Sequence, residues 1–240
     1  MLHTAEYISR RKMMTAVVGV GGAIALAPSI VLAAAEQKEP EVTATEDLMR
    51  EHGVLRRALL VYFETAPRIR KNAASLDASQ LYQTAKLFQD FGENYHERML
   101  EEQHIFPVVR KGPKEAADYV PILIAQHERG REVTEYILAV TKSGTISSAN
   151  AEPLARALDS FVVMYQNHAA REDTVIFPAW KKHFTDKQID ELSDKFEDIE
   201  HKMFGKDGFD DAVNKIMGIE SALGYADISQ FTPPPPPRAE

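Results

Sequence analysis

Four long stretches of the chain place apolar residues at spacings of three and four, the pattern of an α-helix with one buried face. They cover about residues 45–66, 77–110, 116–142 and 149–183. No segment alternates polar and apolar residues with period two over a sustained length, so no sheet is expected. Because the connections are short, we predict an all-α fold, an antiparallel four-helix bundle over residues 45–185.

Prolines indicate where these helices end or bend. Pro67 is expected to end the first helix, because the residue before a proline disfavours the helical conformation. Pro107 and Pro178 lie inside otherwise helical runs and should kink or end them. Their predicted role is structural.

Additional helices are predicted after the bundle. Thr185 and Gln188 form a capping box that opens a fifth, more polar helix to about residue 204. A short sixth helix is expected over about residues 209–223, so that residues 186–225 form a C-terminal helical extension. Residues 226–240 form a Pro-rich tail, expected to be polyproline II where it is ordered and otherwise frayed.

The first 35 residues have the parts of an export signal. A basic segment with paired Arg10 and Arg11 precedes an uncharged run over residues 15–35, which ends in small residues suited to cleavage. The arginine pair indicates twin-arginine export and a periplasmic location. The alternative is an uncleaved membrane anchor, since the run is long enough to span a bilayer, although its Ala/Gly content and Pro28 make it a weak one.

Charge and composition narrow the chemistry of the remaining chain. Residues 36–44 are charged and are interpreted as a linker. Without the first 35 residues the chain has 25 basic and 35 acidic residues, a net charge of about −10 that does not suit nucleic acid or anionic lipid. There is no cysteine, so a disulfide or a thiolate site is excluded and any metal must be held by His and carboxylate side chains.

A repeated motif carries the candidate chemistry. The segment HERMLEEQHIFP (residues 96–107) nearly recurs as HAAREDTVIFP (residues 168–178). In the first and third helices, His52 and His127 are each followed four residues later by an arginine. The chain therefore reads as two helical hairpins, each with two His and one Glu, related by an approximate two-fold axis.

The candidate metal ligands occupy matched positions in the two hairpins. A single His on a helix is usually an ordinary core residue, but six metal-type residues at matched positions indicate a site. Imidazole with carboxylate is a ligand set for non-haem iron or manganese, with zinc as an alternative. The predicted ligands are His52, His96, Glu101, His127, His168 and Glu172.

The two copies differ by one residue. An α-helix turns about 100° per residue, so His168 and Glu172 are about 40° apart and share a face, whereas His96 and Glu101 are about 140° apart. A π-bulge between them would restore a shared face. Otherwise Glu97 and Glu101 form the inward pair and His96 is displaced. We favour the bulge, because His96 follows an aromatic stripe as His168 does.

Four neighbouring charged residues have more ordinary interpretations. Glu102 and Asp173 are interpreted as surface charges or as acceptors for the second nitrogen of a ligand His. Arg56 and Arg131 are interpreted as partners in helix-face salt bridges.

With these residues the chain resembles the hemerythrin-like (HHE cation-binding) family, over about residues 45–185. The resemblance implies two non-haem iron ions, bridging carboxylates and an open position for dioxygen or a related small ligand. It departs from the oxygen-carrying members, which have five His, a Glu and an Asp, with two His four residues apart on the third helix. Here Arg131 follows His127 at that spacing, which places the chain nearer to members with other roles.

Several functions remain open at this point. The favoured one is a binding protein for dioxygen, nitric oxide or peroxide, used in sensing, buffering or delivery, with no catalytic residue assigned. The alternatives are a di-iron redox enzyme of the oxidase, peroxidase-like or nitric-oxide-processing type, an iron-handling protein and a metal-free structural bundle. The protein partner and the oligomeric state are not predicted.

Overall fold

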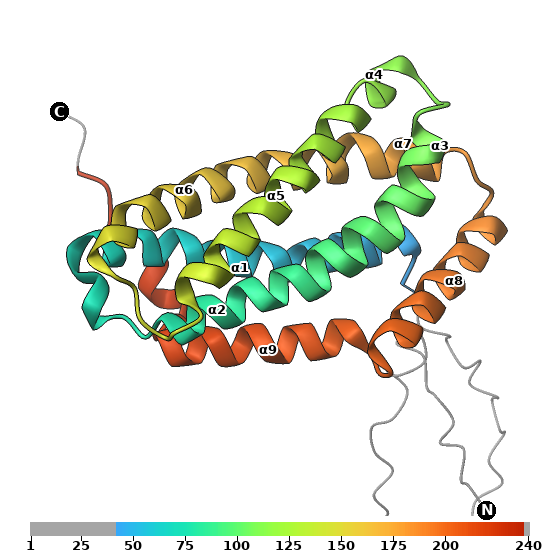
Figure 1. The fold of residues 1–240 in the computed structure, drawn as a ribbon. Coiled ribbons are helices and arrows are strands. Elements are labelled where there is room, and N and C mark those ends of the chain that lie inside the picture. The colour runs from blue at the N-terminus through green and yellow to red at the C-terminus, as the bar shows by residue number, and fades with distance from the viewer. Residues whose placement is uncertain (1–41, 238–240) are drawn as a thin grey trace, which may run out of the picture.

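The computed structural model describes residues 42–237, and within this range all regular structure is helical. Two pairs of long helical segments form the bundle (Figure 1). They are α1 (Ala44–Asn72), α2 (Ala78–Leu87) continued by the π-helix η3 (Phe88–Ile105), α5 (Val120–Thr141), and α6 (Ser148–Arg171) continued by the π-helix η4 (Glu172–Ile176). The predicted all-α bundle is confirmed.

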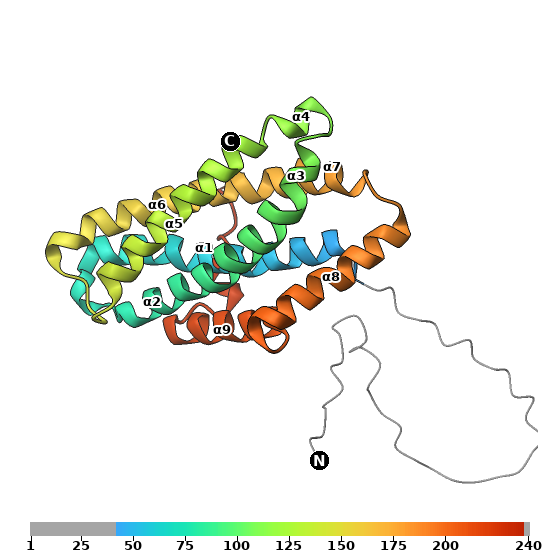
Figure 2. The same cartoon turned by 45° about the vertical axis from the view of Figure 1, so that its right-hand side comes forward.

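The two Phe-Pro segments begin short helices at one end of the bundle. Pro107 lies in the first turn of α3 (Phe106–Val109) and Pro178 in the first turn of α7 (Phe177–Lys181), and these two helices pack against each other (Figure 2). Proline is tolerated there because the first turn has no partner for its missing N–H. The prolines therefore end the π-helices, in agreement with their predicted structural role. A single helical turn, α4 (Lys114–Ala117), follows α3 before α5 begins.

The prediction that the first helix ends at Pro67 is wrong. Helix α1 continues through Pro67 to Asn72 and is followed by a short 3-10 turn, η2 (Ala73–Ser75). Pro67 lacks an N–H for the carbonyl of Phe63, but both residues lie on the exposed face, where water can satisfy that carbonyl. Exposure thus leaves only the steric cost of the proline ring, which is outweighed by the packing of buried α1 residues on both sides of it, such as Ala66 and Ile69.

The C-terminal helices cover one side of the bundle. Helix α8 (Asp186–Phe204) begins at the predicted capping box of Thr185 and Gln188 and contacts α1 and η3. Helix α9 (Gly208–Leu223) lies along α1 and α2 (Figure 2). The rings of Trp180 and Phe196 stack at 5.8 Å and fix α8 to α7. After a 3-10 turn, η5 (Ile228–Phe231), residues 232–237 are exposed.

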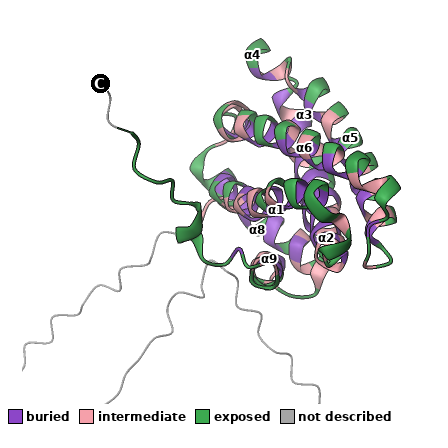
Figure 3. Ribbon diagram, turned by 90° about the vertical axis from the view of Figure 1, so that its left-hand side faces the viewer, coloured by how far each residue is buried: buried purple, intermediate pink, exposed green. Residues whose placement is uncertain are grey.

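The core fills the space between the four long segments. Buried residues face inward on every bundle helix, and exposed ones face outward (Figure 3). The predicted aromatic stripe is buried: Phe88 packs edge-on against Phe161 at 4.9 Å and against Tyr165 at 4.8 Å. This apolar layer lies beside the candidate ligands described below.

The predicted signal segment, residues 1–35, and residues 36–41 of the predicted linker lie outside the described residues; of the remaining linker residues 42–44, Ala44 is the first residue of α1. Among the helices of residues 42–237, none combines the length and the apolar character needed to cross a membrane.

Candidate metal centre

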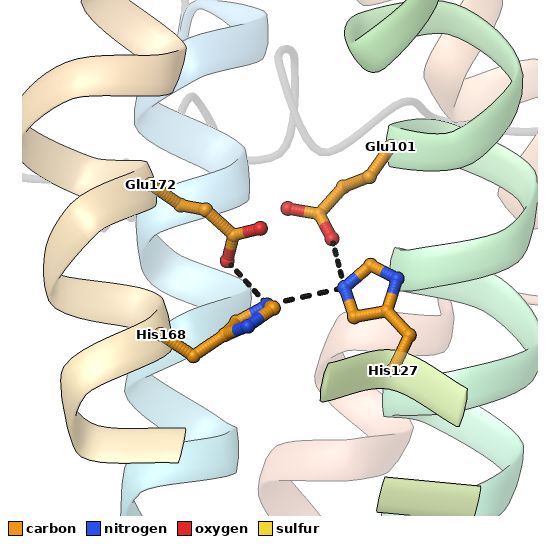
Figure 4. A group of neighbouring side chains, drawn as sticks. All are labelled: Glu101, His127, His168 and Glu172. Carbon is orange, nitrogen blue, oxygen red and sulfur yellow. Dashed lines mark hydrogen bonds and ion pairs between the residues drawn. The ribbon is translucent and has the colours of Figure 1, made fainter. Parts of the chain in front are cut away.

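The six predicted ligands lie together inside the bundle. They come from every long segment: His52 from α1, His96 and Glu101 from η3, His127 from α5, His168 from α6 and Glu172 from η4. Each is 3% exposed or less. Figure 4 shows four of them, Glu101, His127, His168 and Glu172, with their side chains pointing toward one another.

Glu101 lies between two imidazoles from different helices. Its Oε1 is 3.3 Å from Nε2 of His96, and its Oε2 is 3.3 Å from Nε2 of His127. Each oxygen of this carboxylate therefore faces a different part of the site. A carboxylate in this position can bridge two ions.

Glu172 approaches the other two imidazoles through a single oxygen. Its Oε2 is 3.0 Å from Nε2 of His168 and 3.5 Å from Nε2 of His52. Among the described residues, two of the three groups of donor atoms that could hold an ion share Glu101; the third, Glu97, Glu102 and His127, lies on the outer side of His127. Of the two that share Glu101, one is Glu101, His127, His168 and Glu172, and the other is His52, His96 and Glu101.

All four imidazoles turn Nε2 inward and hold Nδ1 against an outer acceptor. The Nδ1 contacts are to Asp173 for His52 at 2.7 Å, Glu51 for His96 at 2.6 Å, Glu102 for His127 at 2.9 Å and Gln126 for His168 at 2.9 Å. A carboxylate can only accept, so each such Nδ1 carries the hydrogen and donates it. In the neutral imidazole the inward Nε2 then has a lone pair.

The inward Nε2 atoms lie in two close pairs, and in this tautomer neither nitrogen of a pair carries a proton. Nε2 of His52 is 3.0 Å from Nε2 of His96, and Nε2 of His127 is 3.1 Å from Nε2 of His168. The oxygens of Glu101 and Glu172 are buried and have no hydrogen-bond partner among the described residues, and these same Nε2 atoms approach them at 3.0–3.5 Å. Lone pairs and buried carboxylate oxygens facing each other are unfavourable unless a cation lies between them. The residues present therefore fit a metal centre.

The same need for positive charge shows in the acid–base properties of the site. Burial by itself lowers the pKa of His127, but the nearby carboxylates Glu97, Glu101 and Glu102 outweigh it and raise the pKa to about 10. Burial by itself raises the pKa of Glu172, but the imidazoles of His168 and His52 outweigh burial and lower the pKa. Without a metal, protons on the imidazoles must supply the charge that the carboxylates require.

The extra residue in the first motif is accommodated by π-helix. The predicted π-bulge is present, although it is longer than a single bulge and extends over Phe88–Ile105. The N–H of Phe106 bonds to the carbonyl of Glu101, five residues back, which is the π spacing. His96 therefore reaches the centre, and the alternative in which Glu97 displaces it is wrong.

A second π-helix follows His168. It was not predicted, because His168 and Glu172 are four residues apart and already share a face of a regular α-helix. It covers Glu172–Ile176 and ends with the N–H of Phe177 bonded to the carbonyl of Glu172. In both copies the π-helix stops at the Phe that precedes a proline. Proline offers no N–H to continue the ladder, which explains why both end there.

The arginines and the second acidic residues form matched outer links. Arg56 pairs with Asp173, which accepts from His52, and Arg131 pairs with Glu102, which accepts from His127. Glu102 and Asp173 are therefore acceptors for the imidazoles of the candidate ligands His127 and His52 rather than free surface charges. The arginines form salt bridges as predicted, but with these acceptors and across helices.

Two outer acceptors were missed in the sequence. Glu51 and Gln126 each precede a candidate ligand His. Each accepts a hydrogen bond from the His of the neighbouring helix in its own hairpin, Glu51 from His96 and Gln126 from His168. The pairs Glu51-His52 and Gln126-His127 in the two copies are the signal that could have identified them.

A small cavity adjoins the centre. Its volume is about 10 Å³, enough for about one water-sized group. Apolar side chains of Leu55, Leu59 and Phe88 form part of its wall, together with Tyr165. The site can therefore admit a very small ligand and not an organic substrate of ordinary size.

Comparison with known proteins agrees with this geometry. The family model of the hemerythrin HHE cation binding domain matches residues 43–180, which include all six candidate ligands. Two curated proteins, "Uncharacterized protein Rv1995" of Mycobacterium tuberculosis and "Uncharacterized protein Mb2018" of Mycobacterium bovis, are each 41% identical over 198 residues, covering 82% of this chain and 76% of theirs. No solved structure matches the chain.

Proposed function

Because the chain belongs to the hemerythrin HHE cation-binding family, we propose that it is an exported non-haem di-iron protein that binds dioxygen or a related small ligand. Nitric oxide and peroxide are the related ligands. The observation that carries the proposal is the pair of donor groups that share Glu101. Two adjoining groups with one common carboxylate are suited to two ions with a bridging ligand.

The donor set supports iron. Four imidazoles with two carboxylates suit iron and manganese, and zinc is the alternative that the same donors accept. An iron pair would supply an open coordination position and one-electron chemistry. The chain supplies the orientation of the ligands and the environment of that position.

The outer acceptors keep the centre in a single arrangement. Three of the four acceptors are themselves held by a second side chain: Asp173 by Arg56, Glu102 by Arg131 and Glu51 by Tyr95. Such partners fix the ring orientation and make the inward nitrogen more basic. The residues that flank the ligands are thus part of the proposed site.

The cavity limits what can reach the centre. Its volume of about 10 Å³ suits a ligand of very few atoms, and Leu55, Leu59 and Phe88 form an apolar part of its wall. The favoured role is therefore uptake of a small ligand for sensing, buffering or delivery.

A redox enzyme acting on peroxide or nitric oxide is the second candidate. The observation that favours it is a hydroxyl group in the cavity wall, that of Tyr165, which donates to the buried carboxylate of Glu97 at 2.7 Å. Multiple turnovers with a reductant would indicate the enzyme, and a stable, reversible absorption band on oxygen addition would indicate the binding protein.

Metal analysis of protein purified without chelator tests the proposal. We expect about two irons per chain, since one ion fits each of the two donor groups that share Glu101. Glu101→Ala should disturb both groups and lose most of the metal, while Glu128→Ala, at an exposed position on α5, should retain it. Wild-type protein that takes up no iron, manganese or zinc would refute the metal centre.

Export is proposed from residues 1–35, which lie outside the described residues. Replacing Arg10 and Arg11 together by Lys should retain the protein inside the cell, because the twin-arginine signal is recognised through that pair. Fractionation of cells that express the two forms measures this. Equal export of both would refute the pathway, and recovery of the uncleaved form in membranes would favour the anchor.

A further inference from the structure

The approximate two-fold symmetry of the centre is broken on one side. Glu97 follows His96, whereas Ala169 follows His168. The side chain of Arg131 contacts Glu97 at 3.2 Å in addition to its pairing with Glu102, whereas Arg56 forms a salt bridge with Asp173 alone among the described residues. One side of the site therefore has a buried carboxylate, with an arginine beside it, that the other side lacks.

Tyr165 donates a hydrogen bond to this additional carboxylate. Its hydroxyl donates to Oε1 of Glu97 at 2.7 Å, and Arg131 binds the other oxygen, Oε2. Both Tyr165 and Glu97 line the cavity beside the centre. The tyrosine ring is 5.4 Å from the ring of His168, a candidate ligand.

The neighbouring helix leaves room for this hydroxyl. Gly130 is in the interior of α5, where glycine is less favourable than alanine by about 1 kcal/mol. A Cβ at Gly130 would lie 2.0 Å from Oη of Tyr165, so a larger residue could not occupy this position without moving the tyrosine. A glycine here thus allows the tyrosine to reach Glu97.

We propose that Tyr165 is a redox-active side chain that gives one electron to the metal centre while its proton passes to Glu97. The inference rests on the proposed di-iron function, and the oxidant is hydrogen peroxide in excess: the first equivalent takes both ferrous ions to ferric, and a further equivalent supplies the oxidising equivalent that Tyr165 reduces by one electron. The O–H bond of Tyr165 breaks, its proton bonds to Oε1 of Glu97, and its electron reduces the centre by one equivalent. The products are a neutral tyrosyl radical and a protonated glutamic acid.

Two other buried tyrosines are less suited to this role. Tyr95 donates to Glu51 at 3.1 Å, but the other oxygen of Glu51 accepts from His96, and Tyr95 is not among the residues that line the cavity. The hydroxyl of Tyr62 has no hydrogen-bond partner among the described residues, so it has no base for its proton. These residues supply matched controls of similar burial.

Electron paramagnetic resonance after peroxide addition tests the proposal. Protein loaded anaerobically with ferrous iron is mixed with hydrogen peroxide, frozen, and examined for an organic radical, with iron content measured in parallel. Wild type should give a tyrosyl signal whose line width changes when ring-deuterated tyrosine is incorporated. Tyr165→Phe should lower the signal to the level of zinc-loaded protein, while Tyr62→Phe and Tyr95→Phe should retain it.

Glu97→Gln tests the proton acceptor separately. Glutamine can still accept the hydrogen bond but is a far weaker base, so the radical yield should fall while iron content stays at the wild-type level. A full signal in Tyr165→Phe, loss of the signal in Tyr95→Phe alone, or no radical in wild type that holds two irons and consumes peroxide would each overturn the proposal. Absence of bound iron would instead count against the proposed function.

Discussion

Glu93 offers a sharp test of the electrostatics beside the centre. It lies on η3 before Glu97 and is only 2% exposed, and its Oε1 has no hydrogen-bond partner among the described residues. Burial raises the pKa of Glu93 from 4.5 to about 7, and the charge of Glu97 adds to the increase. The ionised form is therefore disfavoured in the folded protein.

The expected magnitude follows from this shift. A carboxyl group with a raised pKa stabilises the fold fully below its unfolded pKa, and this contribution is lost as pH rises through the folded pKa. The shift from 4.5 to about 7 corresponds to about 3 kcal/mol of unfolding free energy, lost mostly between about pH 4.5 and pH 7. Glu93→Gln has no charge to bury and removes this dependence.

Urea unfolding of wild type and Glu93→Gln at several pH values measures the effect. The variant should be close to wild type at about pH 4 and more stable by about 2–3 kcal/mol at about pH 8. Taking the difference cancels the titration of groups common to both proteins. Glu128→Gln, at an exposed position, should show no such trend. A difference for Glu93→Gln that stays constant with pH would refute the reasoning.

Two further predictions concern packing and the outer acceptors. Gly130→Ala forces a Cβ against Tyr165 and should destabilise the fold by about 1–3 kcal/mol in urea unfolding, whereas Gly218→Ala, with nothing within 4 Å, should stabilise it by about 0.5–1 kcal/mol. Asp173→Ala removes the acceptor of His52 and should weaken metal affinity by about 10–100-fold in competition with a chelator. Equal stability of the two glycine variants, or unchanged affinity without Asp173, would contradict these expectations.

The bundle and the six residues of the centre could be predicted because both depend on helical phase. Apolar spacing gives the buried face of each helix, and the repeated motif gives the ligands on that face. The extent of the π-helix could not be predicted, since the spacing of His96 and Glu101 reports only the net rotation between them. Pro67 misled the prediction because its local preference was outweighed by the packing of α1 on both sides of it.

The extra residue in the first motif has a second consequence beyond keeping His96 on the centre. Counted back from the Glu of each copy, Glu97 stands four residues before Glu101, where His168 stands before Glu172. In a regular α-helix Glu97 would therefore point toward the centre together with Glu101. In the π-helix His96 occupies that position instead. Glu97 remains buried beside the centre and contacts Tyr165 and Arg131. The insertion thus adds one carboxylate with no counterpart in the other hairpin, and the difference between the two halves depends on this residue.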